Sequence, residues 1–135
     1  LILLTNDGKL ANELTHPRYM HEKEYRVLVK GHLNNKQLDA WRNGVVLETG
    51  YKTLPANVSV SEDEKTHTWL NITLKEGKKR QIREMAKATG LQVVRIIRIR
   101  IATLKLGALN QGEWRYLSDD EVKELLNSRK NNHPQ

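Results

Sequence analysis

The sequence predicts an α+β fold in which a mixed, largely antiparallel sheet is flanked by helices. Alternating apolar and polar residues over 57–61 and 68–75, on either side of a charged stretch, indicate a β-hairpin. A helical pattern at 79–89 is followed at once by a run rich in β-branched residues. Strands and helices mix irregularly along 135 residues, which favours a single α+β domain with a largely antiparallel sheet.

The chain opens with the apolar residues 1–4, which we interpret as a buried strand. A buried strand normally follows a turn or another element, so we expect the sequence to be truncated at its N-terminus. Asn6 or Asp7 is suited to cap a helix that continues to about Leu14 and ends before Pro17.

The next elements are a strand and a short helix. Residues 24–30 have the composition of a strand and end at a glycine. Asn34 or Asn35 can cap a helix that continues to about Arg42. A short extended piece is expected at 45–47, before the hairpin.

The segment 79–89 is the clearest helix, because apolar residues recur on one face and Gly90 can close the helix in the left-handed conformation. Its other face carries a basic stripe of Arg80, Arg83 and Lys87.

The run 92–106 reads as one or two strands with a bend at 102–103. Strict alternation would place two sets of residues on opposite faces: Val93, Arg95, Ile97, Ile99 and Ile101 on the core face, and Val94, Ile96, Arg98 and Arg100 on the other. The second set suits a nucleobase resting on aliphatic carbon beside guanidinium groups, or equally an exposed amphipathic strand.

The C-terminal part is expected to hold a short strand at 113–117 and a last helix to about Ser128, because Ser118 and Glu121 form a capping box. We therefore predict one domain over residues 1–128 and a disordered polar tail over 129–135.

Positive charge is concentrated in residues 75–105, which contain ten Lys and Arg and two Glu and so have a net charge of +8. Because the whole chain has a net charge of +7, the remaining residues sum to −1. A focused basic patch is typical of proteins that bind a polyanion, although a charge run can also be a solvated surface.

Several classes of chemistry are excluded. The absence of cysteine rules out disulfides, thiolate metal sites and cysteine nucleophiles. The five histidines lack the spacing of a zinc site, so zinc is not expected, and neither of the glycine-rich phosphate-binding motifs occurs. No apolar run is long enough to span a membrane, and a cytoplasmic or organellar location is the expectation.

Several segments, in order along nearly the whole chain, resemble the ribosomal pseudouridine synthases of the RsuA and RluB type. The most specific are L-I-L-L-T-N-D-G at 1–8, K-E-Y at 23–25, G-K-K-R-Q-I-R-E-M at 77–85 and G-E-W-R-Y-L at 112–117. The resemblance implies a cytoplasmic, monomeric isomerase that needs neither cofactor nor metal. Its expected partner is ribosomal RNA, of the large subunit rather than the small, and neither DNA nor a membrane.

The resemblance also implies site residues. Tyr25 matches the tyrosine that stacks on the uracil, Arg83 the basic partner of the nucleophilic aspartate, and Ile96 the aliphatic residue that packs on the base. Lys79, Arg80, Arg98 and Arg100 are expected to bind the substrate. From periodicity alone, Tyr25 could equally be a core residue and Arg83 a solvated cation.

In this family the nucleophilic aspartate lies in a G-R-L-D motif just upstream of the segment at 1–8, so it is not in this sequence, and the chain alone is expected to be inactive. Asp7 is rejected as a substitute, since its N-D-G context explains it as a helix cap. Two alternatives stay open: a non-catalytic RNA-binding or ribosome-assembly module, and a basic domain that binds DNA or anionic membrane.

Overall fold

The structure is a computed structural model that describes residues 1–131, with side chains up to Ser128. It contains a five-stranded sheet in which all neighbouring strands are antiparallel. The spatial order of its strands is β2 (Asn57–Asp63), β3 (His67–Leu74), β1 (Lys23–Lys30), β4 (Val93–Ile101) and β5 (Leu104–Lys105). The predicted α+β class and the hairpin are confirmed.

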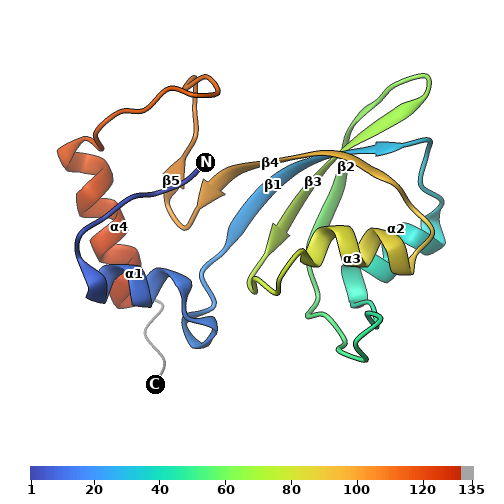
Figure 1. The fold of residues 1–135 in the computed structure, drawn as a ribbon, viewed down its shortest axis with the longest axis horizontal. Coiled ribbons are helices and arrows are strands. Elements are labelled where there is room, and N and C mark those ends of the chain that lie inside the picture. Colours follow the sequence, from blue (N-terminus) through green and yellow to red (C-terminus); the bar gives the residue numbers. More distant parts are fainter. Residues whose placement is uncertain (132–135) are drawn as a thin grey trace.

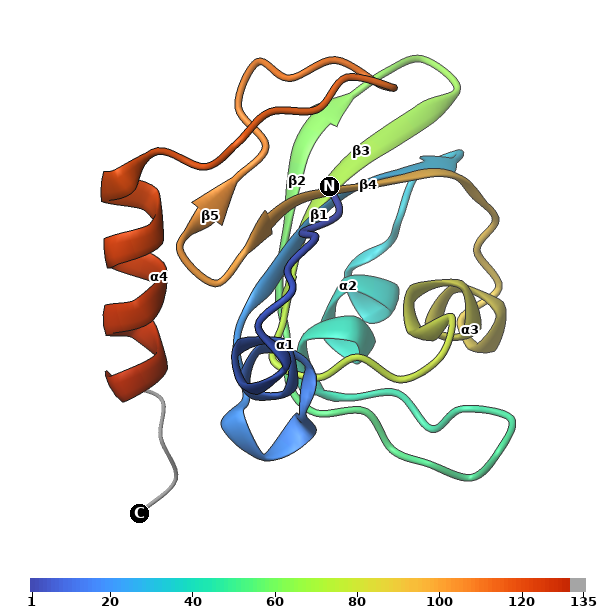
Figure 2. The same ribbon diagram turned by 60° about the vertical axis from the view of Figure 1, so that its left-hand side comes forward.

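The helices form two groups (Figures 1 and 2). Two of them, α2 (Asn35–Asn43) and α3 (Gln81–Ala88), lie together against one face of the sheet. The other two, α1 (Gly8–Thr15) and α4 (Asp119–Asn131), lie near β5, and a 3₁₀ turn (Pro17–Tyr19) leads from α1 towards β1. The helix α4 thus extends past Ser128, and residues 132–135 of the expected tail lie outside the described residues.

The main core lies between the sheet and the pair α2 and α3. Strands β1 and β3 contribute fully buried side chains from alternate positions, and Trp41 and Met85 cover them from the two helices. The core residues buried to the greatest extent are Val27, Val29, Leu70, Ile72, Trp41 and Met85. Each such side chain contributes about 1.5–3 kcal/mol through the removal of apolar surface from water, so the helix-covered face of β1 is held rigidly.

A second, smaller cluster joins the other helices to the β4–β5 bend. Leu14 of α1 and Leu125 of α4 pack with Ala102, which occupies the left-handed region at φ 51°. The predicted bend at 102–103 is confirmed by that conformation and by the reversal from β4 into β5.

Helix caps occur where local sequence predicts them. The Asp7 carboxylate accepts bonds from the amides of Lys9 and Leu10 at the start of α1. Asn34 and Gln37 form a complete capping box at the start of α2. The capping box of Ser118 and Glu121 is present at α4. These caps satisfy amides that have no partner inside the helix.

Two predicted strands are wrong. The segment 1–4 is irregular: Ile2 and Leu4 are 76% and 88% exposed, and it pairs with no strand in the described part of the chain. The segment 113–117 is also irregular, with Trp114 and Tyr116 75% and 85% exposed. Glu113 and Asn110 form a local turn in which the Glu113 amide donates to the Asn110 carbonyl and the Glu113 carboxylate accepts from the Asn110 amide. No strand ladder in the described residues includes this segment.

The predicted alternation along β4 is also wrong, because the register against β1 shifts twice, between Glu24 and Tyr25 and between Leu28 and Val29. Each shift leaves one β4 residue unpaired, and a bulge of this kind reverses which side chains share a face. Since directly opposed residues share a face, the pairs Val29–Val93, Val27–Ile96 and Tyr25–Arg98 lie on the helix-covered face. The pairs Leu28–Arg95, Arg26–Ile97 and Glu24–Arg100 lie on the opposite face.

Candidate active site

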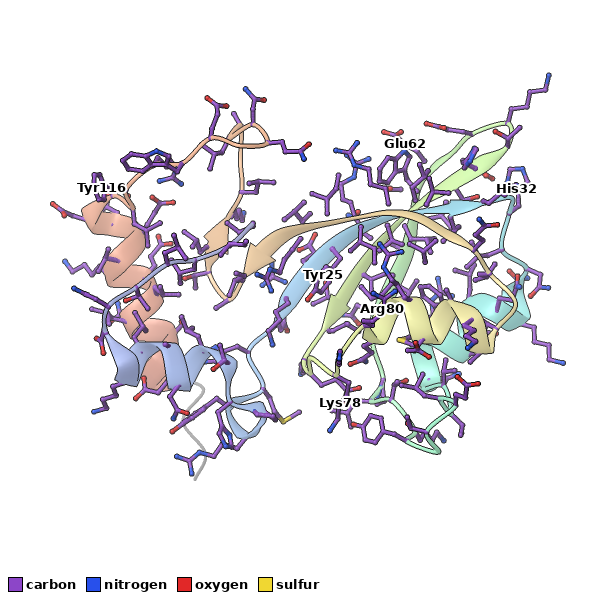
Figure 3. All side chains as sticks on the ribbon, in the orientation of Figure 1. Tyr25, His32, Glu62, Lys78, Arg80 and Tyr116 are labelled. Atoms are coloured by element: carbon purple, nitrogen blue, oxygen red, sulfur yellow. The ribbon has the colours of Figure 1, made fainter. Side chains whose placement is uncertain are left out.

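A pocket of about 170 Å³ opens between β1, β4 and the start of α3. Tyr25, Ile96 and Arg83 all line it, together with Lys78 and Arg80. Tyr25 and Arg80 are labelled in Figure 3, where both lie at this junction. The remaining lining residues are Leu74, Gly77, Gln81 and Ile82. The two residues expected to be catalytic, Tyr25 and Arg83, and the expected substrate-binding residue Ile96 thus come from distant segments of the chain to one cavity.

Tyr25 and Ile96 form the sheet side of the pocket. Tyr25 is half-buried and lies on the same face of β1 as Val27, whose partner across to β4 is Ile96. Both side chains pack against the main core. A flat ring beside an aliphatic side chain makes an apolar surface on which another planar group can rest.

Arg80 and Arg83 form the helix side. Arg83 lies in the first turn of α3, and its side chain is exposed on the face away from the buried Ile82 and Met85. Arg80 precedes the helix in the left-handed conformation, at φ 54°, and its side chain makes no capping bond. The predicted helix therefore begins at Gln81, not Lys79, and the basic stripe runs from the preceding turn into the helix. The amide end of a helix adds further positive potential here.

A buried carboxylate holds the turn that carries these cations. Glu76 accepts bonds from the Tyr51 hydroxyl, the Leu54 amide and the Gln81 side-chain amide. The side-chain oxygen (Oε1) of Gln81 in turn accepts from the Lys78 backbone amide at 3.1 Å. The hydrogen bond to Glu76 is the largest cause that raises the pKa of Tyr51. This network fixes both ends of the loop between β3 and α3, so the cations on it are preorganised.

The other predicted substrate-binding residues are distributed differently. Arg98 is directly opposite Tyr25 on β4, and its guanidinium donates to the Leu1 carbonyl at 3.0 and 2.8 Å. Lys79 is exposed on the loop but does not line the pocket.

Arg100 lies on the opposite face of the sheet, where it forms ion pairs with Glu22 and Glu24 at 3.1 and 3.0 Å. Burial is the largest single contribution and lowers the pKa of Arg100. The hydrogen bonds and negative charges of Glu24 and Glu22 together outweigh burial, so the pKa of Arg100 is raised overall. The expected shared surface of Arg98 and Arg100 is therefore wrong.

Sequence reasoning did not assign five of the lining residues to the site, and it missed the contacts made by Glu76 and Tyr51. The five are Leu74, Gly77, Lys78, Gln81 and Ile82. Lys78 was noted only as part of the basic patch. The signal for the others is weak, because a buried Glu–Gln–Tyr network depends on contacts over 25 residues of sequence that no local pattern reveals.

Within residues 1–131, no group of three or more His, Asp or Glu side chains is placed to hold a metal ion. No helix in that range is both long and apolar enough to cross a bilayer.

The pocket combines an aromatic ring, an aliphatic side chain and guanidinium groups, an arrangement that is chemically suited to a planar base with anionic oxygens beside it. Comparison with known proteins identifies the class of protein. Residues 1–88 match the family described as RNA pseudouridylate synthase, and the chain belongs to that family. The resemblance inferred from the motifs is confirmed.

Three relatives illustrate the match. A ribosomal large subunit pseudouridine synthase B of Bacillus subtilis is 42% identical over 93% of this chain and 52% of its own length. An uncharacterized RNA pseudouridine synthase of Aquifex aeolicus is 40% identical, covering 93% of this chain and 50% of the relative. A ribosomal large subunit pseudouridine synthase E of Xanthomonas campestris is 38% identical over 85% of this chain and 69% of its own length.

A crystal structure of a pseudouridylate synthase superimposes with a TM-score of 0.82 at 29% identity, covering 90% of this chain and 52% of that chain. The agreement confirms the fold. The chain spans about half the length of this structure and of most of the curated relatives named above.

Proposed function

We propose that this chain is the greater part of the catalytic domain of a pseudouridine synthase that isomerises a uridine in ribosomal RNA. The observation that carries the proposal is that Tyr25, Ile96 and Arg83 line the same pocket. The nucleophilic aspartate that the family's mechanism requires is proposed to lie upstream of Leu1.

The reaction breaks the bond between the uracil and the ribose, turns the base, and rejoins it through a ring carbon. The Tyr25 ring and the Ile96 side chain hold the base by stacking and packing. The ring carbon that forms the new bond loses a hydrogen, and the released ring nitrogen gains one. The Tyr25 hydroxyl is the pocket's candidate for this proton transfer. Arg83 binds the attacking carboxylate and keeps it ionised.

The proposed substrate is large-subunit ribosomal RNA, supported by the printed names of the relatives from Bacillus subtilis and Xanthomonas campestris. A cytoplasmic location and a monomeric state are part of this proposal.

The test uses a longer protein that contains these residues and the upstream segment, assayed for pseudouridine in transcribed large-subunit ribosomal RNA. Arg83→Ala and Tyr25→Phe should each lower the turnover number by about a hundredfold or more, the usual magnitude for a lost proton-transfer or orienting group. Tyr25→Phe should leave the KM nearly unchanged, because the ring that stacks is retained.

The matched control is Lys30→Gln, which removes a charge from the exposed end of β1 and should leave turnover unchanged. Full activity in both pocket variants would refute the assigned roles. Absence of pseudouridine formation by the longer wild-type protein, with RNA binding retained, would favour a non-catalytic RNA-binding module instead.

A further inference from the structure

Tyr51 lies in the segment 44–56, which joins α2 to β2 and contacts the loop before α3. Within this segment the Leu47 amide donates to the Tyr51 carbonyl at 2.8 Å, and Val46 bridges to Lys52 across the same turn. The half-buried Tyr51 ring packs against the main core. Both the backbone and the ring of Tyr51 are therefore held in place, although the residue belongs to no helix or strand.

Tyr51 makes two different contacts with the loop between β3 and α3. Its hydroxyl donates to the Glu76 carboxylate, and the Lys78 Nζ lies 4.6 Å from the centroid of its ring. An ammonium group above an aromatic ring is attracted by the negative face of that ring. Since the Lys78 backbone amide is also held by the Gln81 side chain, both ends of Lys78 are restrained.

This restraint matters because a lysine side chain is ordinarily mobile. Its long stem samples many rotamers, and fixing them costs free energy when the ammonium binds a ligand. A lysine that is already held in position loses less of that freedom. Contact with the face of a ring leaves ammonium hydrogens available to an anionic oxygen, so Tyr51 orients Lys78 without using up its donors.

Lys78 is exposed and lines the pocket from the loop before α3, close to Arg80 (Figure 3). Tyr25 and Ile96 form the sheet side of the pocket, where the proposed function places a base. A cation at another side of the pocket meets the part of a nucleotide that projects away from the base, which is the sugar and its phosphates. Ammonium groups bind phosphate oxygens as point charges.

We infer that Lys78 binds a phosphate of RNA next to the nucleotide held on Tyr25, and that Tyr51 is the positioning residue that holds Lys78 for this contact. The inference rests on the proposed function, since it is a nucleotide on Tyr25 that brings its flanking phosphates to the loop. Bound there, the phosphate fixes the backbone while Tyr25 and Ile96 hold the base.

The first test measures binding of labelled pentauridylate to this chain by fluorescence anisotropy. A second probe carries uncharged methylphosphonate linkages on both sides of the central uridine. The wild-type chain should bind the second probe about tenfold more weakly. Lys78→Gln should bind pentauridylate about fivefold more weakly and lose only about twofold further with the second probe, because both changes remove the same contact.

The second test measures whether Tyr51 acts through Lys78. Tyr51→Leu removes the ring and should bind pentauridylate about threefold more weakly, whereas the same substitution in the Lys78→Gln background should change the affinity little. Tyr51→Phe keeps the ring and should retain nearly the wild-type affinity, although it loses the bond to Glu76. If Tyr51→Leu does not fold, as judged by its thermal unfolding, Tyr51→Met provides the same comparison.

Lys75→Gln is the matched control, since it removes the same charge from an exposed lysine of the same loop that does not line the pocket. It should retain both the wild-type affinity for pentauridylate and the wild-type difference between the probes. An equal loss in Lys75→Gln and Lys78→Gln would indicate a general charge effect and would overturn the phosphate contact.

Undiminished sensitivity to methylphosphonate in Lys78→Gln would also overturn the phosphate contact and would leave the proposed function standing. An equal loss from Tyr51→Leu in the two backgrounds would overturn the positioning role, because Tyr51 would then affect binding independently of Lys78. Failure of the wild-type chain to bind pentauridylate at all would count against both the phosphate contact and the proposed function.

Discussion

Thr89, which follows the last residue of α3, joins that helix to α2. Its hydroxyl donates to the Met85 carbonyl at 2.8 Å and accepts from the Trp41 indole nitrogen at 2.9 Å. Its own carbonyl accepts from the Gln37 side chain at 3.0 Å. Because Trp41 is fully buried, its N–H has no route to water. One hydroxyl thus satisfies a buried donor that would otherwise be costly.

Replacing Thr89 with valine keeps the size of the side chain but removes that acceptor. We expect Thr89→Val to lower the free energy of unfolding by about 1–3 kcal/mol, the cost of leaving a buried donor unpaired. Urea denaturation measures the change. In a Trp41→Phe background, where no N–H remains to satisfy, the same substitution should cost clearly less. An equal cost in both backgrounds would show that the indole bond is not the cause.

At the scale of elements, the start of α4 is held by one carboxylate. Glu121 forms two bonds to the Arg115 guanidinium, at 2.6 and 2.7 Å, and accepts from the Ser118 amide at 2.9 Å. The bond to Arg115 is the main cause that lowers the pKa of Glu121, from 4.5 to about 2. The ionised form therefore stabilises both the helix start and the irregular segment 113–117 before it.

The sign of the pH effect follows from that lowered pKa. Because Glu121 binds its proton less readily in the folded state, its contribution is complete above pH 4.5 and disappears as the pH falls towards about 2. Glu121→Gln should therefore lower the melting temperature at pH 7, and the difference from wild type should shrink steadily below pH 4.5. Thermal unfolding followed by circular dichroism tests this. A difference that stays constant down to pH 2 would contradict it.

The elements that sequence predicts correctly are those determined by neighbouring residues. The caps at Asp7, Asn34 and Ser118 each depend on a side chain two or three residues from its partner, so the sequence reveals them directly. The hairpin follows from alternation on both sides of a charged turn. The register of β4 could not be predicted, because each bulge is defined against β1, about 70 residues away in the sequence. The two false strands, 1–4 and 113–117, have strand-like composition but no strand neighbour in the described part of the chain.

The candidate site was predictable only in part, and only through the resemblance to a known family. Tyr25, Arg83 and Ile96 came from family motifs, and the structure brings them to one pocket. Composition and periodicity would have left each of them a core residue or a solvated cation. Their convergence depends on pairing between distant strands, which a single sequence does not record.

At the scale of the whole molecule, the concentrated positive charge of residues 75–105 is divided between the two faces of the sheet. Arg80, Arg83 and Arg98 lie on or beside the pocket. Arg95 and Arg100 lie on the opposite face, where Arg100 is already neutralised by two glutamates. A net charge counted along the sequence therefore overstates the number of cations that can meet RNA at one surface.

This division predicts how RNA affinity responds to salt. Each phosphate contact on single-stranded RNA contributes about 0.7 to the slope of log K against log salt concentration, because bound counterions are released. Arg80→Gln should weaken pentauridylate binding and reduce that slope by about 0.7. Arg95→Gln removes the same charge from the same basic segment, but on the opposite face of the sheet. It should therefore change the affinity for pentauridylate and the salt slope much less than Arg80→Gln does. Anisotropy titrations at several salt concentrations measure both quantities. Equal effects of the two substitutions would mean that RNA responds to the overall charge of the domain, and that the pocket face does not direct binding.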